Sequence, residues 1–401
     1  MTRAIVIGAG PAGLGPLLCA MQRGVDGELL SRGVTWLEGS ARVGCGALGA
    51  WGIDSDTRAE VLLESVERSP ALRDLLTHER AQCVERHRGG SIPLRDAAAF
   101  LEVVGTRLAS HMLGTPSAVH TETVAERVIH EKDGSYTVLA RTKQGPRSFH
   151  AETVVYAMGG RAITASLELR APALTAATLF GTDGRAHLHA QLPERPTIAI
   201  VGGSHSAFAA ATIVLEELGA RLAPGALQIL TRRRPKLFYP SLAEAHADGY
   251  TEATEQDVCP ETGRVHRLGG LRLGSRELLR RVWGLGDAAP EPRVQVVPYA
   301  IDSLPRFDRV ITALGFDANT VPYYRGDQRV ALHAERGERA RLVDHACRLL
   351  DADAQALPDA WGIGLASGYV PRGEPSFRGQ TNGIWLYQND TGALLLDALL
   401  R

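Results

Sequence analysis

The 401-residue chain lacks long apolar runs, paired cysteines and a surplus of either charge. No apolar run approaches the roughly 20 residues that a membrane-spanning helix needs, which argues against a transmembrane protein. The formal net charge is −1, so bulk electrostatics give no support for binding to nucleic acid or to an acidic membrane. Lysine is also scarce, with three residues among the 44 basic ones, and this skew indicates a GC-rich genome rather than a mechanism.

The cysteines are few and scattered, at Cys19, Cys45, Cys83, Cys259 and Cys347. Their number is odd and no two are spaced as CxxC or CxxxxC, which argues against a disulfide framework, a zinc site and a dithiol redox centre. We therefore expect no metal. The N-terminus enters an apolar strand directly, without a charged leader and apolar signal segment. These features predict a cytoplasmic protein.

The composition that remains is that of a globular enzyme, with 44% hydrophobic and 22% charged residues. The length exceeds one ordinary domain and is sufficient to bury a large core. A soluble protein of two domains is expected.

A glycine-rich turn follows the first apolar strand and has the GxGxxG pattern, Gly8-Ala9-Gly10-Pro11-Ala12-Gly13. Gly8 lets the chain turn sharply, Gly10 lets the backbone approach a pyrophosphate, and Gly13 lets the next helix pack on the sheet. That helix directs its N-terminal N–H groups and dipole at the phosphates. The turn, including Pro11 and Ala12, is therefore predicted to bind a dinucleotide.

An acidic residue, Glu38, ends the second predicted strand, Val34–Glu38. It lies within the roughly 20 to 30 residues at which a carboxylate accepts hydrogen bonds from a ribose diol. Glu38 suits NAD as well as FAD. The N-terminal position of this site, with a second site downstream, favours FAD.

The second glycine turn follows the apolar strand Thr197–Val201 and reads Gly202-Gly203-Ser204-His205-Ser206-Ala207. Serine and alanine replace the second and third glycines of the pattern, so the phosphate approach is expected to be less close. The hydroxyls of Ser204 and Ser206 are able to compensate by hydrogen bonding to phosphate. Two such turns in one chain indicate electron transfer from one dinucleotide to another.

Three arginines end the next strand, Leu227–Thr231, where an NAD-specific site has an acid. Guanidinium groups of Arg232 and Arg233 match a ribose 2′-phosphate, which favours NADPH over NADH. A solvated basic loop is the alternative interpretation.

The pattern of strands and helices predicts an α/β fold with two Rossmann-like dinucleotide-binding domains, the NADPH domain being inserted into the FAD domain. The predicted division is residues 1–192 and 301–401 for the FAD domain and 193–300 for the NAD(P)H domain. Within the first part we expect a helix with a capping box from Thr57 to Glu60, another from Asp96 to about Leu113, and an antiparallel meander. The predicted meander strands are residues 124–129, 136–141 and 148–150, followed by a buried strand at 153–160 that ends in glycines.

Four features of the chain resemble flavin-dependent monooxygenases with separate FAD and NADPH domains, especially their N-hydroxylating branch. The two turns come in the family's order. Asp308–Phe316 is similar to its D-x(4)-ATG-Y segment, with Leu314 for Thr and Phe316 for Tyr. Phe180-Gly181, followed by His187 and His189, is similar to FxGxxxH but differs in spacing. Gly383–Leu400 resembles the C-terminal stretch of amine N-hydroxylases.

This resemblance implies an NADPH-consuming FAD monooxygenase that oxidises a small molecule with oxygen, through a flavin hydroperoxide, with N-hydroxylation of an amine as one outcome. It places Asn389, Thr391 and Gly392, before the last helix, beside the flavin; an ordinary helix cap is the alternative. Trp51 matches the tryptophan of the family's GGxW and is able to flank the flavin, or to pack in the core. No triad or paired-carboxylate motif is recognisable, so no catalytic side chain is assigned.

Two long segments have no assigned role. Residues 238–281 exceed a minimal Rossmann crossover and are predicted to form a lid or part of the substrate pocket. Residues 364–380 include Arg372 and Arg378, which either bind a substrate carboxylate or are solvated. An FAD-linked NAD(P)H reductase or oxidase without oxygen insertion, and a flavin-binding regulator, are the alternative functions.

Overall fold

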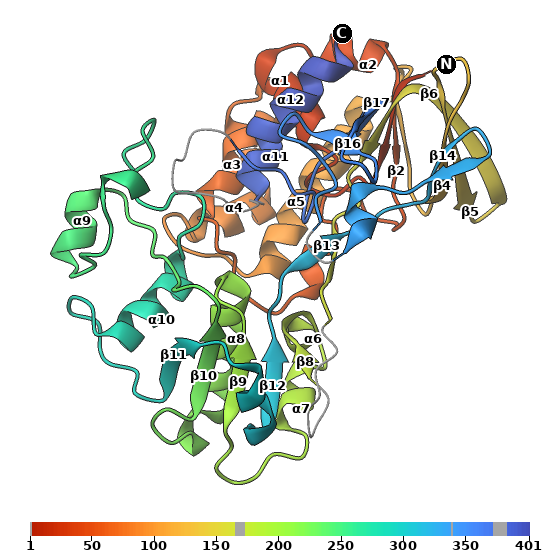
Figure 1. Ribbon diagram of the computed structural model, residues 1–401. Coiled ribbons are helices and arrows are strands. Elements are labelled where there is room, and N and C mark those ends of the chain that lie inside the picture. The colour runs from red at the N-terminus through yellow and green to blue at the C-terminus, as the bar shows by residue number, and fades with distance from the viewer. Residues whose placement is uncertain (1, 165–172, 338–339, 372–382) are drawn as a thin grey trace.

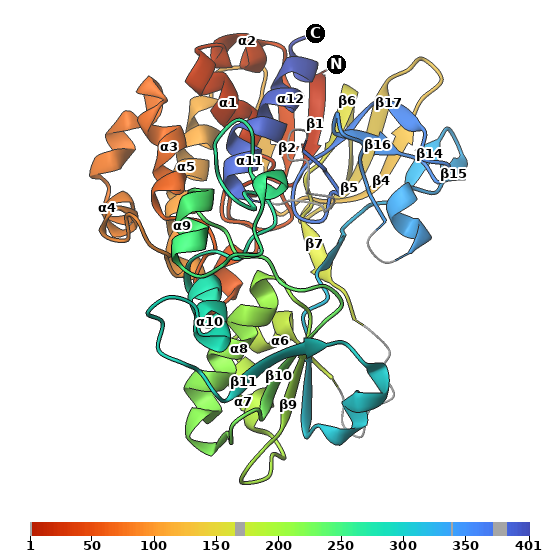
Figure 2. The ribbon, with the colours of Figure 1, turned by 60° about the vertical axis from the view of Figure 1, so that its left-hand side comes forward.

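The structure is a computed structural model that describes residues 2–164, 173–337, 340–371 and 383–401. The chain forms two bodies, each built around its own sheet, as Figures 1 and 2 show. Both termini lie on the body with the larger sheet (Figure 1). The predicted α/β fold class is confirmed.

The larger sheet has a parallel half, in which β1 pairs with β2 and β6, β2 with β3, and β6 with β17. Ala4, Ile5 and Val6 of β1 are fully buried, as expected of a parallel strand covered on both faces. The ten strands of this sheet are β1 (Thr2–Ile7), β2 (Val34–Leu37), β3 (Ala118–His120), β4 (Val124–His130), β5 (Tyr136–Thr142), β6 (Gly145–Tyr156), β14 (Tyr323–Arg325), β15 (Gln328–Val330), β16 (Arg348–Leu350) and β17 (Ala356–Gly362).

The antiparallel half contains the predicted meander, β4–β5–β6. The strands expected at 148–150 and 153–160 are joined in one 12-residue strand, β6, which ends at Tyr156. Its first half pairs with β5 and alternates between buried and exposed side chains, whereas its second half pairs with β1 and is buried. The sequence pattern changes within β6 because the cover on the sheet changes.

The smaller sheet is entirely parallel, in the order β11-β10-β9-β12-β8. Its strands are β8 (Leu174–Thr175), β9 (Ile198–Val201), β10 (Leu227–Thr231), β11 (Val294–Pro298) and β12 (Arg309–Thr312). The division expected at residues 193 and 300 therefore falls inside this sheet, because β8 precedes one limit and β12 follows the other. The sequence of β12 does not show to which sheet it belongs, because the parallel strands of both sheets are short and buried.

Two short strands, β7 (Gly160–Ala162) and β13 (Phe316–Ala318), pair antiparallel where the chain passes between the bodies (Figures 1 and 2). We propose these crossing strands as the domain boundaries in place of residues 193 and 300.

Helices cover both sheets. The helices of the first body are α1 (Gly15–Arg23), α2 (Asp26–Ser31), α3 (Glu60–Glu67), α4 (Glu79–Arg86), α5 (Leu94–His111), α11 (Ile384–Gln388) and α12 (Asp390–Leu399). Those of the second body are α6 (Ala176–Phe180), α7 (Gly184–His189), α8 (His205–Leu218), α9 (Leu242–Ala247) and α10 (Leu273–Trp283). The helix predicted from Asp96 is confirmed as α5. The capping box at Thr57 was wrong, because α3 starts after Ala59, whose side chain accepts no capping hydrogen bond.

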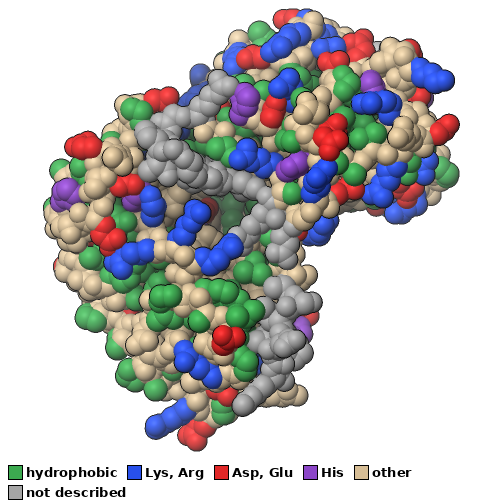
Figure 3. Space-filling model, viewed as in Figure 1, with side chains coloured by type: hydrophobic (Ala, Val, Ile, Leu, Met, Phe, Trp, Pro, Cys, Tyr) green, Lys and Arg blue, Asp and Glu red, His purple; other side chains and the backbone are tan. Residues whose placement is uncertain are grey.

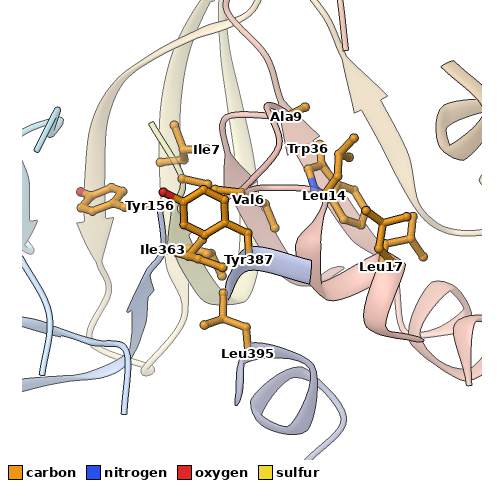
Figure 4. Packing of buried hydrophobic residues seen from close by; sticks show 14 of the residues in the cluster. Val6, Ile7, Ala9, Leu14, Leu17, Trp36, Tyr156, Ile363, Tyr387 and Leu395 are labelled. Atoms are coloured by element: carbon orange, nitrogen blue, oxygen red, sulfur yellow. The ribbon is translucent and has the colours of Figure 1, made fainter. Parts of the chain in front are cut away.

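Each body has its own hydrophobic core. Figure 4 shows the first core, where Tyr387 and Leu395 of the C-terminal helices join Val6 and Ile7 of β1. The last helices thus hold the N-terminal strand and its turn in place. Within the described residues, no helix has the length and apolar character to cross a membrane.

Candidate functional site

The turn after β1 is fixed by contacts that exclude larger side chains. Gly8 has a φ of +104°, and a Cβ there would collide with the carbonyl oxygen of Ala157. A Cβ at Gly13 would collide in turn with the carbonyl oxygen of Gly8. The indole N–H of Trp36 donates to the Gly13 carbonyl oxygen at 2.8 Å. The turn is therefore a rigid element of the sheet rather than a free loop.

Several backbone N–H groups of this turn are free to donate hydrogen bonds. The N–H groups of Gly10, Ala12 and Gly13 donate to no acceptor in the part of the chain that the structure describes. They lie just ahead of α1, whose dipole adds positive potential there. Unsatisfied N–H groups at a helix N-terminus are the chemistry that binds a pyrophosphate.

A second glycine loop faces the first turn, and the sequence did not identify it as part of the site. The Gly44 N–H donates to the Ala9 carbonyl oxygen at 2.7 Å. A Cβ at Gly10 would lie 3.3 Å from the Gly46 Cα, and one at Gly46 would lie 3.2 Å from the Pro11 Cδ. The two backbones thus approach each other closely, and a side chain added at either glycine would press on the facing loop. The signal available in the sequence was the pair Gly44 and Gly46, soon after the acidic residue.

Glu38 lies beside the same turn. One carboxylate oxygen accepts from the Ala9 N–H at 2.9 Å and the other from the Ser40 N–H at 2.8 Å. Each oxygen keeps a lone pair for another donor. The carboxylate is thus held beside the turn by two backbone N–H groups.

The second turn repeats this geometry after β9. Gly202 has a φ of +147°, and a Cβ there would collide with the Ala313 carbonyl oxygen. A Cβ at Gly203 would lie 3.1 Å from the Thr231 Cγ2. Ser204 is the exposed residue before α8, and its hydroxyl caps no backbone N–H. Neither this hydroxyl nor that of Ser206 bonds to a described residue, so both remain available to a ligand.

The three arginines after β10 differ from one another. Arg234 pairs with Glu252 at 2.5 Å and lies 4.0 Å from the centroid of the Trp283 ring. Arg232 and Arg233 are exposed, and neither forms an ion pair within the described ranges. The Arg233 carbonyl oxygen would lie 3.8 Å from a Cβ at Gly203, so its backbone borders the second turn.

Trp51 contacts Phe316, the last residue of the segment Asp308–Phe316 that resembles the monooxygenase motif. Its ring stacks on that of Phe316, with centroids 5.5 Å apart and planes at 29°. Trp51 is partly exposed and packs against the second core. The structure therefore joins the loop that follows Gly46 to the second crossing strand.

The C-terminal residues predicted beside the flavin make structural contacts. The Thr391 hydroxyl donates to the Leu386 carbonyl oxygen at 3.0 Å, and the Asn389 amide donates to the Trp385 carbonyl oxygen at 2.9 Å. A Cβ at Gly392 would lie 2.9 Å from the Cys19 sulfur of α1. These residues bring α12 against α1, the helix that begins at the first turn.

Other candidates from the sequence do not join this site. His187 and His189 are exposed on α7, and His189 pairs with Glu217 at 3.0 Å. Arg372 and Arg378 lie outside the described residues. No cluster of three or more metal-binding side chains exists within the described ranges.

Comparison with known proteins gives one full-length relative and several structural neighbours. The chain is 35% identical over 436 aligned positions to the CMP-5′-(3-aminopropyl)phosphonate hydroxylase of Streptomyces rubellomurinus, covering 99% of this chain and 97% of that protein. No protein-family model matches. The fold is similar to L-lysine 6-monooxygenase from Pseudomonas syringae (TM-score 0.59, 18% identity, 100% and 99% of the two chains). It is also similar to the ornithine N-hydroxylase of Kutzneria sp. 744 (TM-score 0.56, 14% identity, 99% of both chains).

Proposed function

This chain belongs to the two-dinucleotide-domain flavoprotein monooxygenase family, and from that premise we propose that it N-hydroxylates a primary amine with FAD, NADPH and oxygen. The balanced reaction is RNH₂ + NADPH + H⁺ + O₂ → RNHOH + NADP⁺ + H₂O. The observation that carries the proposal is the full-length relative, a hydroxylase named for an aminopropyl compound. FAD supplies the redox chemistry when bound, and the protein supplies position and exclusion of water.

FAD is assigned to the first turn. The N–H groups of Gly10, Ala12 and Gly13 would hold its pyrophosphate, Gly8 and Pro11 would shape the turn, and Glu38 would accept from the ribose. The free N–H donors of the turn and its lack of side chains at Gly10 and Gly46 support this assignment. The structural neighbours support FAD as well, since one is a cadaverine monooxygenase from Erwinia amylovora described as bound to FAD.

NADPH is assigned to the second turn. Gly202 and Gly203 would let the backbone approach its pyrophosphate, and the hydroxyls of Ser204 and Ser206 would donate to it. Arg232 and Arg233 would pair with the 2′-phosphate, a role that suits exposed guanidinium groups without a described partner.

Four further residues would help to position the flavin or the elements around it. Trp51 would lie beside the flavin where the two bodies meet, and its stacking on Phe316 would hold its ring there. Asn389, Thr391 and Gly392 would fix α12 against α1 and so place the helix N-terminus near the cofactor. The cytoplasmic location expected from the sequence remains a prediction.

The proposed substrate is a primary amine carried on an anionic group such as a phosphonate or its nucleotide ester. The test is to incubate the FAD-loaded protein with NADPH, air and CMP-5′-(3-aminopropyl)phosphonate, and to follow the product by mass spectrometry. We expect a gain of one oxygen atom, and one NADPH consumed per product formed. NADPH oxidation that yields only hydrogen peroxide with every amine would contradict the proposal and favour an oxidase.

A further inference from the structure

An additional folded segment, residues 236–272, separates β10 from α10; we call it the crossover segment. Its Tyr250 ring stacks on Tyr239 (centroids 5.7 Å apart) and on Trp283 of α10 (6.3 Å). Tyr239 also pairs its backbone with that of Val265. Tyr239, Tyr250 and Val265 are buried. The segment therefore presents its surface side chains from a fixed support.

The crossover segment reaches the first body at two places. The Arg267 Cζ lies 5.6 Å from the ring centroid of Trp385 in α11. The Arg272 N–H donates to His205 Nε2 at 3.1 Å, and His205 Nδ1 lies 3.5 Å from a carboxylate oxygen of Asp56. Figure 2 shows this green segment crossing in front of α11. The segment thus borders both the C-terminal helices and the start of α8 after the second turn.

Three arginines, Arg267, Arg272 and Arg276, form what we call the arginine cluster. Each guanidinium carbon lies near an aromatic ring: Arg267 near Trp385, Arg272 4.9 Å from the Phe238 centroid, and Arg276 5.3 Å from the Tyr239 centroid. The cluster is linked internally, since the Arg272 guanidinium donates to the Arg267 carbonyl oxygen and Arg276 donates to the Phe238 carbonyl oxygen at 3.3 Å.

Arginines farther along α10 have a different environment. Arg280 pairs with Asp248 at 2.5 Å, and Arg281 pairs with Glu291 at 2.8 Å. Each of these charges is compensated by a carboxylate in close contact. They therefore stabilise the fold and are not available to a ligand.

Arg267 has no such close carboxylate, and its guanidinium donates to the Cys259 sulfur at 3.7 Å. Its nearest carboxylate within the described ranges is Glu261, 3.9 Å away on a side chain that is 70% exposed. Arg276 forms no ion pair with any residue that the structure describes. A guanidinium supported by an aromatic ring keeps its N–H edge for a planar or tetrahedral anion. Figure 3 shows several basic side chains gathered on the face where the two bodies meet, next to a hollow.

The carboxyl group of Asp390 lies close enough to Arg267 for the two charges to interact. Asp390 begins α12, and the Tyr369 hydroxyl donates to its carboxylate at 3.2 Å. Burial raises the pKa of Asp390, while Tyr369 and the nearby charge of Arg267 act in the opposite direction. A carboxyl group beside the arginines suits a ligand with both a cationic and an anionic end.

We propose that Arg267, supported by Arg276, is a specificity-determining residue that binds the phosphonate or phosphate group of an anionic amine substrate. The inference rests on the proposed function for the identity of the ligand, and on the arginine cluster for the site. The crossover segment is then the element that selects an anionic amine over a simple one. The amine end of the substrate lies toward the C-terminal helices and away from the cluster.

The test compares Arg267→Ala and Arg267→Lys with Arg264→Ala, an exposed arginine of the same segment. The KM for CMP-5′-(3-aminopropyl)phosphonate should rise by about 10- to 100-fold in Arg267→Ala, the loss expected for a charge-assisted bond. Arg267→Lys should recover part of the lost affinity, because lysine keeps the positive charge but lacks the planar guanidinium that binds an anion through two N–H groups. The KM for NADPH and the rate of FAD reduction by NADPH alone should stay within about two-fold of the wild type in all three variants.

Calorimetric titration with the same phosphonate separates this inference from the proposed function. Binding to the wild type that weakens about 10-fold or more in Arg267→Ala supports the anion site, even where no hydroxylated product forms. No binding to the wild type, or equal binding to both proteins, overturns the inference. A rise in the KM for NADPH in place of the amine would also overturn it, because Arg267 would then bind the dinucleotide.

Discussion

Trp51 and Phe316 stack across the junction of the two bodies, with ring centroids 5.5 Å apart. Trp51 follows the glycine loop that faces the first turn, and Phe316 begins the strand that returns to the first body. Next to this stack, the Gly52 N–H donates to the Phe180 carbonyl oxygen at 2.7 Å. The relative position of the two proposed cofactor sites therefore depends on an aromatic pair and a backbone bond.

Replacing either ring should lower stability and also uncouple the two sites. A double-mutant cycle with Trp51→Ala and Phe316→Ala should give a coupling of about 0.5–1.5 kcal/mol in the free energy of unfolding. Each single variant should oxidise more NADPH per hydroxylated product than the wild type. The matched control is the His120–Phe149 pair, with centroids 5.0 Å apart inside the first body, which should change stability without changing the NADPH-to-product ratio. A coupling of zero would contradict the structural role.

Local patterns in the sequence were sufficient for both glycine turns, because each glycine requirement comes from contacts within a single strand–turn–helix unit. The meander and α5 followed from periodicity for the same reason. The domain boundaries did not follow, since β12 pairs with β9 through contacts that no local pattern records. A buried strand has the same hydrophobic pattern in either sheet, so the pattern does not identify the sheet to which it belongs.

Contacts between the bodies were outside the reach of sequence patterns. Trp51 was a candidate for the flavin or the core, and only the position of Phe316 shows what it touches. Arg267 had no pattern to mark it, because Trp385 lies in a distant part of the chain. The contact between Arg267 and Trp385 depends on how the crossover segment folds around Tyr250, which is a tertiary property.

Gly10→Ala should abolish most FAD binding without unfolding the protein. The added Cβ would lie 3.3 Å from the Gly46 Cα, in close contact with the facing loop, and would keep the pyrophosphate from approaching the backbone. We expect the dissociation constant for FAD to rise at least about 10-fold, as measured by quenching of flavin fluorescence. Gly27→Ala is the control, because a Cβ there meets nothing within 4 Å. Unchanged FAD affinity in Gly10→Ala would place the pyrophosphate elsewhere.

Arg233→Ala should weaken NADPH binding selectively. Arg233 is exposed, and its backbone borders the second turn, so its guanidinium is available to a 2′-phosphate. We expect the KM for NADPH to rise by about 10- to 100-fold, the cost of a lost charge-assisted bond, and the KM for NADH to stay unchanged. Arg234→Ala serves as comparison, since Glu252 and Trp283 already hold that side chain. Equal effects on both nucleotides would contradict a 2′-phosphate contact.

His266 should make the crossover segment sensitive to acid. The side chain is 3% exposed, and burial lowers its pKa to about 4, with the Lys236 charge acting in the same direction and Asp257 opposing it. Because the fold favours the neutral ring, the stabilisation is complete above the unfolded pKa near 6.5 and is lost as the pH falls toward 4. A shift of this size corresponds to about 3 kcal/mol. His266 has a φ of +44°, a left-handed backbone that asparagine also accepts. Because asparagine does not titrate, His266→Asn should lose about 3 kcal/mol less stability than the wild type between pH 7 and 4 in urea denaturation. Parallel losses in the two proteins would mean that His266 keeps an ordinary pKa in the fold.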